Sequence, residues 1–411
     1  MAIIVQKFGG TSVADAEKIR RAAGRVIKAV KNGYSVVVVA SARGQQTDEL
    51  IADALELNPN PPKREMDQLL STGEQQSVSL FAMAIDAMGY PAISFTGTQV
   101  QMLTDNVHTK ARIKSIGGER IKKQLDEGKI VLVAGFQGVD KDGNITTLGR
   151  GGSDTTAVAL AAAMGAKECE IYTDVDGVYT TDPRIFKDAI KLEQISYDEI
   201  LEMASLGAGV MHSRSIEFGK KYNVKIHVRS SLAEKEGTII MHELPEMEGV
   251  VVTGATVQKD MAKIDLINVD NKPGNAAKIF AALAKAKVVV NDIMQTEVSS
   301  KKANLSFLIG ISDLASAKEA AGQIKDEVNC ESIFVREDIA EISVVGVGMR
   351  THYGVAERMF GALAKAKINI DSITTSEIRI SCVVSKKQAN EALRVVSTAF
   401  ELDKCPKERT K

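Results

Sequence analysis

Ile3-Ile-Val-Gln-Lys-Phe-Gly-Gly-Thr-Ser12, close to the start of the chain, is an apolar run that passes directly into a glycine turn. Four later segments are also rich in β-forming residues, and longer helical patterns that open with capping residues such as Asp or Ser separate them. Strands that are apolar on both faces are typical of a buried parallel sheet. The alternation therefore predicts an α/β (αβα) sandwich with a mostly parallel sheet. We expect its strands at 3–7, 35–40, 130–134, 169–173 and 225–229, its main helices at 15–32, 67–88, 153–164 and 212–222, and a proline-rich loop at 58–62.

The last third of the chain contains an internal duplication. A shift of 80 residues lays Phe280-Ala-Ala-Leu-Ala-Lys-Ala-Lys287 on Phe360-Gly-Ala-Leu-Ala-Lys-Ala-Lys367. Each copy follows the order strand, glycine turn, helix, strand, strand, helix, which predicts a ferredoxin-like module. The first copy has an additional strand at 331–335, the second copy lacks its last strand, and the apolar run 250–257 has no partner. We therefore expect 250–257 to complete the second module, which places the first module inside the second.

These patterns give the expected domain bounds. An α/β domain covers 1–245, the inserted module covers 263–338, the second module covers 249–262 together with 339–403, and 404–411 is a polar tail. A chain of 411 residues is long enough for two or three domains, each with its own core.

Composition excludes several classes of function. The 52 basic and 53 acidic residues give a net charge of −1, so nucleic acid and anionic membranes are not expected partners. No apolar run approaches the ~20 residues that span a bilayer, and no signal-peptide core is present, so we expect a cytoplasmic protein. The four cysteines lie far apart, without the spacing of a zinc site, and we expect them to be reduced and structural.

Two glycine-rich loops carry the first chemical signal. Lys7 precedes Gly9-Gly10 at a strand-to-helix turn, and Leu148-Gly-Arg-Gly-Gly-Ser-Asp154 holds a cation and a carboxylate at a second helix entry. Backbone N–H groups at such turns bind anions, and a helix N-terminus adds partial positive charge. A lone Gly-Gly pair also suits a tight turn with a solvated lysine. Two such entries in one domain favour a polyphosphate held beside a second anionic group.

Common alternatives fail on spacing. The chain has no Walker motif, no serine-hydrolase elbow and no HExxH metalloprotease motif. Gly346-Val-Gly-Met-Arg-Thr351 lacks the third glycine of a dinucleotide fingerprint and lies in the repeat, so we interpret it as a turn.

Two polar segments remain open to two interpretations, and a third lies where ligands are expected to bind. Asp174-Val-Asp-Gly-Val-Tyr-Thr-Thr-Asp-Pro-Arg184 suits a nucleotide pocket, but taken alone it favours a plain hairpin at Asp176-Gly177. Glu74 in Ser71-Thr-Gly-Glu74 suits catalysis or a capping box equally well. Ser41-Ala-Arg-Gly-Gln-Gln-Thr47 follows a strand on the side where ligands bind in open α/β sheets.

Four ordered motifs resemble the signatures of the aspartate kinase family. They are Lys7-Phe-Gly-Gly-Thr-Ser-Val13, Ser71-Thr-Gly-Glu74, Thr146-Thr-Leu-Gly-Arg-Gly-Gly-Ser-Asp154 and Thr173-Asp-Val-Asp-Gly-Val-Tyr-Thr-Thr-Asp-Pro-Arg184. The likeness covers essentially the whole chain, because the duplication resembles the tandem ACT regulatory modules of that family. It implies an amino-acid-kinase fold that transfers the γ-phosphoryl group of ATP, with Mg²⁺, to the side-chain carboxylate of L-aspartate. A carboxylate is already ionised near neutral pH, so this reaction needs no general base.

The resemblance also implies roles for single residues. Lys7 would bridge the transferred phosphoryl group and the attacking carboxylate, and Asp154 would organise the cations. Arg150 would bind the α-carboxylate, Glu74 the α-ammonium, and Ser41 and Thr47 would hydrogen-bond the substrate. No residue is assigned to a metal. The expected nucleotide-binding residues are Lys7, Phe8, Gly9, Gly10, Ser12, Gly151, Gly152, Ser153, Thr173, Asp174, Tyr179, Asp182, Pro183 and Arg184.

The repeated modules resemble amino-acid-binding regulatory modules, whereas a ligand-free dimerisation module is the alternative. Lysine and threonine, alone or together, are the inhibitors that the resemblance implies. A homodimer or tetramer through the modules is expected, with a small second subunit from an internal start at Met247 or Met261 as a weaker hypothesis. The expected effector-binding residues are Asn271, Gly274, Ala276, Val289, Val290, Asn291 and Gln295 in the first copy, and Val355, Ala356, Asn369, Ile370, Ser376 and Glu377 in the second.

One position departs from the family pattern. Many relatives carry Lys, as an additional phosphate contact, where this chain has Gly209. Competing functions are a kinase for glutamate, N-acetylglutamate or a nucleotide, and an amino-acid sensor with an inactive kinase half. The retained set Lys7, Glu74, Arg150 and Asp154 argues against the sensor.

Overall fold

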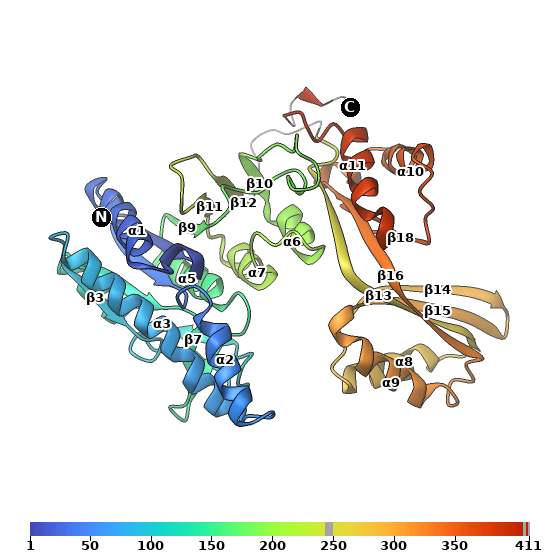
Figure 1. Cartoon of the computed structure of the whole chain (residues 1–411), viewed down its shortest axis with the longest axis horizontal. Helices are drawn as coiled ribbons and strands as arrows, with labels where there is room; N and C mark the ends of the chain where they lie inside the picture. The colour runs from blue at the N-terminus through green and yellow to red at the C-terminus, as the bar shows by residue number, and fades with distance from the viewer. Residues whose placement is uncertain (243–249, 406–407, 410–411) are drawn as a thin grey trace. The chain divides into compact units, whose positions relative to one another are not determined.

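A computed structural model describes residues 1–242, 250–405 and 408–409 (Figure 1). The chain divides into two compact units. The first comprises Met1–Tyr179, Lys191–Ser205 and Gly209–Glu246, and the second comprises Thr180–Ile190, Leu206–Ala208 and Met247–Lys411.

The first unit is built around an eight-stranded sheet in the order β10-β12-β11-β9-β1-β2-β6-β3. All neighbouring strands are parallel except β11 and β12, which confirms the mostly parallel sheet expected from the sequence. The strands are β1 (Ile3–Phe8), β2 (Ser35–Ala40), β3 (Ala92–Phe95), β6 (Ile130–Ala134), β9 (Glu168–Thr173), β10 (Gln194–Ser196), β11 (Ile226–Ser230) and β12 (Thr238–Met241).

Helices pack against this sheet around a core of aliphatic side chains. Helices α1 (Ala16–Lys31) and α3 (Lys63–Asp86) bury their apolar sides against β1, β2 and β6, with Phe8 and Phe81 in ring contact. Helix α5 (Gly152–Met164) contacts strands β1, β2 and β9 and helix α7 (Ser213–Tyr222). The remaining helices of this unit are α2 (Gln46–Leu57), α4 (Glu119–Asp126) and α6 (Tyr197–Ser205).

Two local expectations need correction. Helix α3 begins at Lys63, four residues before the expected start at Asp67, because Pro62 with φ −57° is already suited to a helix entry. The expected hairpin at Asp176-Gly177 does not form. The segment after β9 makes only one isolated bridge, between Tyr179 and Lys191, because β9 is already paired with β1 and β11 on its two edges.

A second, four-stranded sheet of the first unit has the order β5-β4-β7-β8. Its strands are β4 (Met102–Thr104), β5 (Ile113–Ile116), β7 (Gln137–Val139) and β8 (Ile145–Thr147). Strand β8 contacts helix α3. Loop 105–112 connects β4 to β5, and the loop that contains Arg150 begins where β8 ends.

The second unit contains one six-stranded sheet in the order β14-β15-β13-β16-β18-β17. Each copy of the duplication places its helix at the same offset, α8 (Asn275–Lys285) and α10 (Val355–Lys365), after glycines with φ of 98° and 89°. The remaining elements are β13 (Gly254–Asp270), β14 (Val290–Ser299), β15 (Lys302–Gly310), α9 (Leu314–Ile324), β16 (Ser332–Val345), β17 (Ser372–Thr375), β18 (Arg379–Ser385) and α11 (Ala389–Ala399).

The long strands β13 and β16 run through both copies. The start of β13 pairs with the end of β16 (Gly254 with Val345), and the end of β13 pairs with the start of β16 (Ile267 with Ser332). This is the pairing that an inserted first module requires, although the strand begins at Gly254 and not at residue 250. Two separate cores result, one under α8 and α9 and the other under α10 and α11.

The cysteines and the longest helices complete the description. All four cysteines are free; Cys169, Cys330 and Cys382 are buried, and Cys405 is exposed. Among the described residues, no helix combines the length and the apolar character needed to cross a membrane.

Candidate active site

The glycine turn after β1 lies against the loop that follows β2. A Cβ atom on Gly10 would come within 2.6 Å of the Ala42 carbonyl oxygen, so only glycine fits. The Gly44 N–H donates to the Gly10 carbonyl at 3.0 Å, and the Ser41 N–H donates to the Phe8 carbonyl at 3.1 Å. The carboxyl ends of two adjacent parallel strands therefore meet here, at the position where open α/β sheets bind ligands.

Lys7 and Asp154 form an ion pair beside this turn. Lys7 is the penultimate residue of β1, Asp154 lies in the first turn of α5, and the distance from Nζ to Oδ1 is 2.6 Å. Their side chains are only 11% and 14% exposed, so the charges interact with little screening. The pair fixes a lysine ammonium at the mouth of the glycine turn, where a phosphoryl group can reach it.

Glu74 faces the same loop from helix α3. Its residue is 3% exposed, and its Oε1 accepts the Ala42 N–H at 3.1 Å. Its Oε2 is buried without a hydrogen-bond partner. Burial raises the pKa of Glu74 to about 8, although the hydrogen bond from Ala42 acts in the opposite direction. Glu74 lies in the middle of the helix, so the capping-box interpretation is wrong. A buried carboxylate with one unpaired oxygen is suited to bind a cation.

Arg150 occupies an exposed loop between β8 and α5. Gly149 and Gly151 have φ of 78° and 69°, a conformation that glycine adopts without strain. Arg214, from α7, donates to the Leu148 carbonyl at 2.7 Å and to the Ala111 carbonyl at 2.8 Å. Arg214 thus holds the loop through its backbone, while the Arg150 side chain remains exposed and accessible to an anion.

Ser41 and Thr47 are both half-buried. Ser41 follows β2 directly, and Thr47 lies in the first turn of α2. The structure therefore groups the glycine turn, the Lys7–Asp154 pair, the Ser41 loop and Glu74 around the carboxyl ends of β1 and β2.

The expected nucleotide residues are only partly brought together. Gly9, Gly10 and Ser12 form the turn after β1, and Gly151, Gly152 and Ser153 form the entry of α5. The Phe8 ring is fully buried and stacks on Tyr172 with centroids 4.8 Å apart, so only its backbone is free to contact a ligand.

Thr173 and Asp174 lie at and just after the end of β9 and bond to each other through Oγ1 and Oδ1 at 3.1 Å. The Tyr179 hydroxyl donates to Asp176 at 2.8 Å, and burial raises the pKa of Tyr179 to about 12. Asp182, Pro183 and Arg184 belong to the second unit, where Arg184 Nη2 pairs with Asp182 at 2.8 Å.

Comparison with known proteins identifies the family. Residues 2–230 match the model of the amino acid kinase family, and residues 342–400 match an ACT domain. An aspartokinase of Bacillus sp. (strain MGA3) is 49% identical over 402 residues, and aspartokinase 2 of Bacillus subtilis is 46% identical over 406, with 98% or more of each chain covered. This chain belongs to the aspartate kinases.

The fold of solved relatives agrees with this assignment. The structure of E. coli aspartokinase III in complex with aspartate and ADP superposes with a TM-score of 0.82 at 25% identity, covering 97% of this chain and all of that one. The aspartate kinase from Synechocystis is 40% identical with a TM-score of 0.55 and covers 97% of this chain and 70% of that one. The chain is thus an aspartate kinase with an ACT regulatory domain.

The effector candidates of the kinase lie at corresponding places in its two copies. Asn271, Gly274 and Ala276 surround the entry of α8, and Val355 and Ala356 begin α10. Val355 is only 8% exposed and contributes to the core, so its backbone alone is free for a ligand. The other candidates lie in or near the edge strands β14 and β17: Val289, Val290, Asn291, Gln295, Asn369, Ile370, Ser376 and Glu377.

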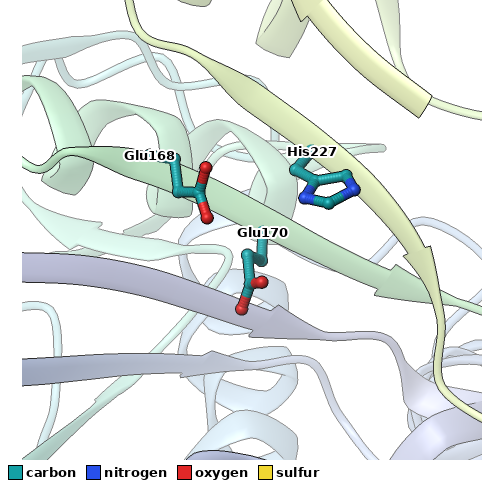
Figure 2. Close-up of side chains that lie close together, drawn as sticks. All are labelled: Glu168, Glu170 and His227. Atoms are coloured by element: carbon teal, nitrogen blue, oxygen red, sulfur yellow. The ribbon is translucent and has the colours of Figure 1, made fainter. Parts of the chain in front are cut away.

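One cluster in the described part of the kinase has the composition of a metal site. The side chains of Glu168, Glu170 and His227 lie close together (Figure 2), and their potential ligand atoms are within 4.8 Å of one another. Glu170 already accepts hydrogen bonds from Arg229 and Gln6, both at 2.6 Å, and Glu168 pairs with a lysine. These donors neutralise both carboxylates, so we assign no metal to this cluster.

Sequence reasoning missed two contributors to the site of the kinase. The Ala42 N–H, which bonds Glu74, is a backbone group and has no sequence signature. Arg214 is one of many surface-type arginines in the sequence, and only the tertiary structure shows that it joins the Ala111 and Leu148 carbonyls.

Proposed function

We propose that this aspartate kinase transfers the γ-phosphoryl group of ATP to the side-chain carboxylate of L-aspartate and forms 4-phospho-L-aspartate. The complex of E. coli aspartokinase III with aspartate and ADP supports this choice of substrates. Both reactants are anions, so the protein has to neutralise charge and align the carboxylate with the phosphoryl group. A base is unnecessary, because the attacking carboxylate is already ionised at neutral pH.

The observation that carries the proposal is the unpaired oxygen of Glu74. A buried carboxylate with a free acceptor is suited to the α-ammonium of an amino acid. Arg150 then binds the α-carboxylate, and Ser41 and Thr47 hydrogen-bond the substrate. With both ends of the amino acid held, the side-chain carboxylate is directed towards the phosphoryl donor.

Lys7 neutralises the transferred phosphoryl group and the attacking oxygen in this mechanism. Asp154 holds the lysine ammonium in place through their 2.6 Å contact. The N–H groups of the two glycine-rich turns bind the phosphates, and Tyr179 contributes to nucleotide binding. Mg²⁺ enters with ATP and supplies further charge neutralisation, and we assign no protein ligand to it.

The ACT modules give the kinase its regulation in this proposal. Lysine, threonine or both bind at the effector candidates and inhibit the enzyme, which would place it in the biosynthesis of lysine, threonine and methionine, in the cytoplasm. We propose that the catalytic part spans 1–245, the inserted module 263–338, the second module 249–262 with 339–403, and the tail 404–411.

The modules also mediate a homodimer or tetramer in this proposal. Of the two internal starts, Met247 lies outside the described residues. A start at Met261 would remove Gly254–Gln258, which pairs with the end of β16, so that fragment would lack one strand of the second module.

The test is ADP release from Mg-ATP with L-aspartate, L-glutamate or no acceptor, each repeated with lysine, threonine and both. We expect turnover that depends on aspartate and is reduced by at least one amino acid. Turnover with glutamate but not with aspartate would refute L-aspartate as the substrate. Undiminished turnover in the presence of both lysine and threonine would refute the proposed inhibition.

A further inference from the structure

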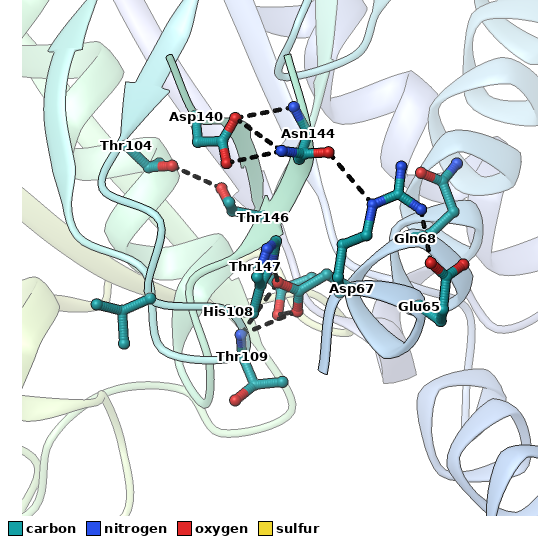
Figure 3. Close-up of polar contacts among 12 residues, drawn as sticks. Glu65, Asp67, Gln68, Thr104, His108, Thr109, Asp140, Asn144, Thr146 and Thr147 are labelled. Carbon is teal, nitrogen blue, oxygen red and sulfur yellow. Dashed lines mark hydrogen bonds and ion pairs between the residues drawn. The ribbon is translucent and has the colours of Figure 1, made fainter. Parts of the chain in front are cut away.

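Asp67 is a buried carboxylate that the mechanism above does not use. It lies in helix α3, is completely buried, and its two oxygens face three groups from two other segments (Figure 3). Oδ1 accepts the Thr147 hydroxyl at 2.5 Å and the Thr109 N–H at 3.0 Å, and Oδ2 lies 2.7 Å from Nδ1 of His108. A carboxylate with this number of partners fixes the relative positions of the segments that supply them.

Thr109 has an unusual backbone conformation at this contact. Its φ is +69°, a left-handed conformation that is disfavoured for a β-branched residue. Such strain persists only where surrounding contacts hold the residue in place. The two oxygens of Asp67 lie 3.0 and 3.1 Å from the Thr109 N–H and provide that restraint.

The loop that Asp67 holds in turn supports the loop of Arg150. A Cβ atom on Gly149 would come within 3.0 Å of the Thr109 carbonyl oxygen, so the two backbones are in close contact. The Ala111 N–H donates to the Thr147 carbonyl at 2.9 Å, and Arg214 joins the Ala111 and Leu148 carbonyls. A shift of Thr109 would therefore displace the backbone next to Arg150.

Asp67 and Glu74 belong to the same helix and are separated by about two turns, so they lie on the same helix face. Asp67 thus connects the helix of Glu74, which is proposed to bind the α-ammonium, to the loop of Arg150, which is proposed to bind the α-carboxylate. We propose that Asp67 is a positioning residue that sets the spacing between Glu74 and Arg150 and thereby the affinity for the amino-acid substrate. This inference rests on the proposed function of those two residues.

Two adjacent threonines provide a matched test. Thr146 and Thr147 are both buried in β8 and both hydrogen-bonded, but Thr147 bonds Asp67, whereas Thr146 lies 2.6 Å from the hydroxyl of Thr104. We expect Thr147→Val to raise the KM for aspartate about fivefold and to leave the KM for ATP within about twofold. Thr146→Val should leave both within about twofold.

Asp67→Asn tests the carboxylate directly. We expect its KM for aspartate to rise at least about tenfold, with the KM for ATP within about twofold. Asp140→Asn is the control, because Asp140 is also buried and accepts two backbone N–H groups, at 2.8 and 2.9 Å, but only within its own turn. The double variant Asp67→Asn with Thr109→Gly should recover most of the aspartate affinity, since glycine adopts the left-handed conformation without strain.

Several outcomes would overturn the inference. If Thr147→Val and Thr146→Val changed the KM for aspartate equally, the contact with Asp67 would have no special role. This comparison remains decisive even if Asp67→Asn does not fold. A parallel rise in the KM for ATP, or no recovery by Thr109→Gly, would indicate a general structural role. Aspartate-dependent ADP release by the unchanged enzyme is measured first, and its absence would refute the proposed function instead.

Discussion

The protonation state of Glu74 should make aspartate binding depend on pH. Its pKa of about 8 means that the free enzyme holds this carboxyl mostly protonated at pH 7. The proposed partner is an ammonium group, which binds only the ionised form. Aspartate binding at pH 7 must therefore release a proton from Glu74, and the cost of that ionisation weakens the apparent affinity.

The magnitude follows from the ionised fraction. With a pKa of about 8, roughly one molecule in eleven is ionised at pH 7, half at pH 8 and about nine in ten at pH 9. Apparent affinity is reduced by the fraction of the competent form, so the KM for aspartate should fall about tenfold between pH 7 and pH 9. This corresponds to about 1.4 kcal/mol of binding free energy.

The assay is ADP release at saturating Mg-ATP over this pH range, with the KM for aspartate determined at each pH. Calorimetric titration of aspartate in two buffers of different ionisation enthalpy should show about 0.9 protons released at pH 7, for the same reason. Deprotonation of the substrate ammonium would raise the KM with pH, so it cannot produce the expected fall.

Glu74→Gln is the control for this experiment. It keeps the shape of the side chain but cannot ionise, so its KM should be higher than that of the unchanged enzyme at pH 9 and should not fall with pH. A flat aspartate KM in the unchanged enzyme, or an equal fall in Glu74→Gln, would refute the assignment of Glu74 to the α-ammonium.

Three further predictions concern other charged groups. Lys7→Met should lower kcat by about 10² to 10³, because a positioned charge at the transferred group is lost; circular dichroism should show an intact fold, and near-normal turnover would contradict the role of Lys7. Glu377→Ala should weaken inhibition by the amino-acid effector about tenfold. The uninhibited rate should stay within about twofold, because the ion pair of Glu377 with Arg350 at 3.1 Å is exposed and contributes little to stability. Unchanged inhibition curves would exclude Glu377 from the effector site. Burial and the neighbouring Asp292 raise the pKa of Glu341 from 4.5 to about 7, so its contribution to stability is present below pH 4.5 and is lost as pH rises through 7. The Tm of Glu341→Gln relative to that of the unchanged protein should therefore increase from pH 5 to pH 8. A difference in Tm that stays constant over this range would argue against the shift.

The sequence predicts the regular parts of the fold well, because periodicity and capping residues act locally. Asp15 caps α1 through the Lys18 N–H, as its place before a helical pattern predicts. The 80-residue repeat correctly predicts that α8 and α10 occupy equivalent positions. The short strands of the four-stranded sheet were not predicted, since three or four residues carry too little periodicity.

The geometry of the site depends on contacts that no local pattern encodes. The left-handed Thr109 is an example, because threonine has no preference for that conformation and its N–H is held by Asp67, 42 residues earlier. The Asp176-Gly177 segment failed as a hairpin for the opposite reason, since its local turn signal is overridden by the pairing of β9 with its two neighbours.

The antiparallel pairing of β13 with β16 has a consequence for synthesis of the chain on the ribosome. The Gly254–Gln258 stretch emerges before residues 263–338, which we propose to be the inserted module, but its partner residues 341–345 are made only after them. Closing so long a loop is slow compared with local folding. The first strand of the second module therefore has an unpaired edge throughout this interval, and such edges promote association between chains. Truncations that end before residue 341 should aggregate even though the inserted module has all of its own strands.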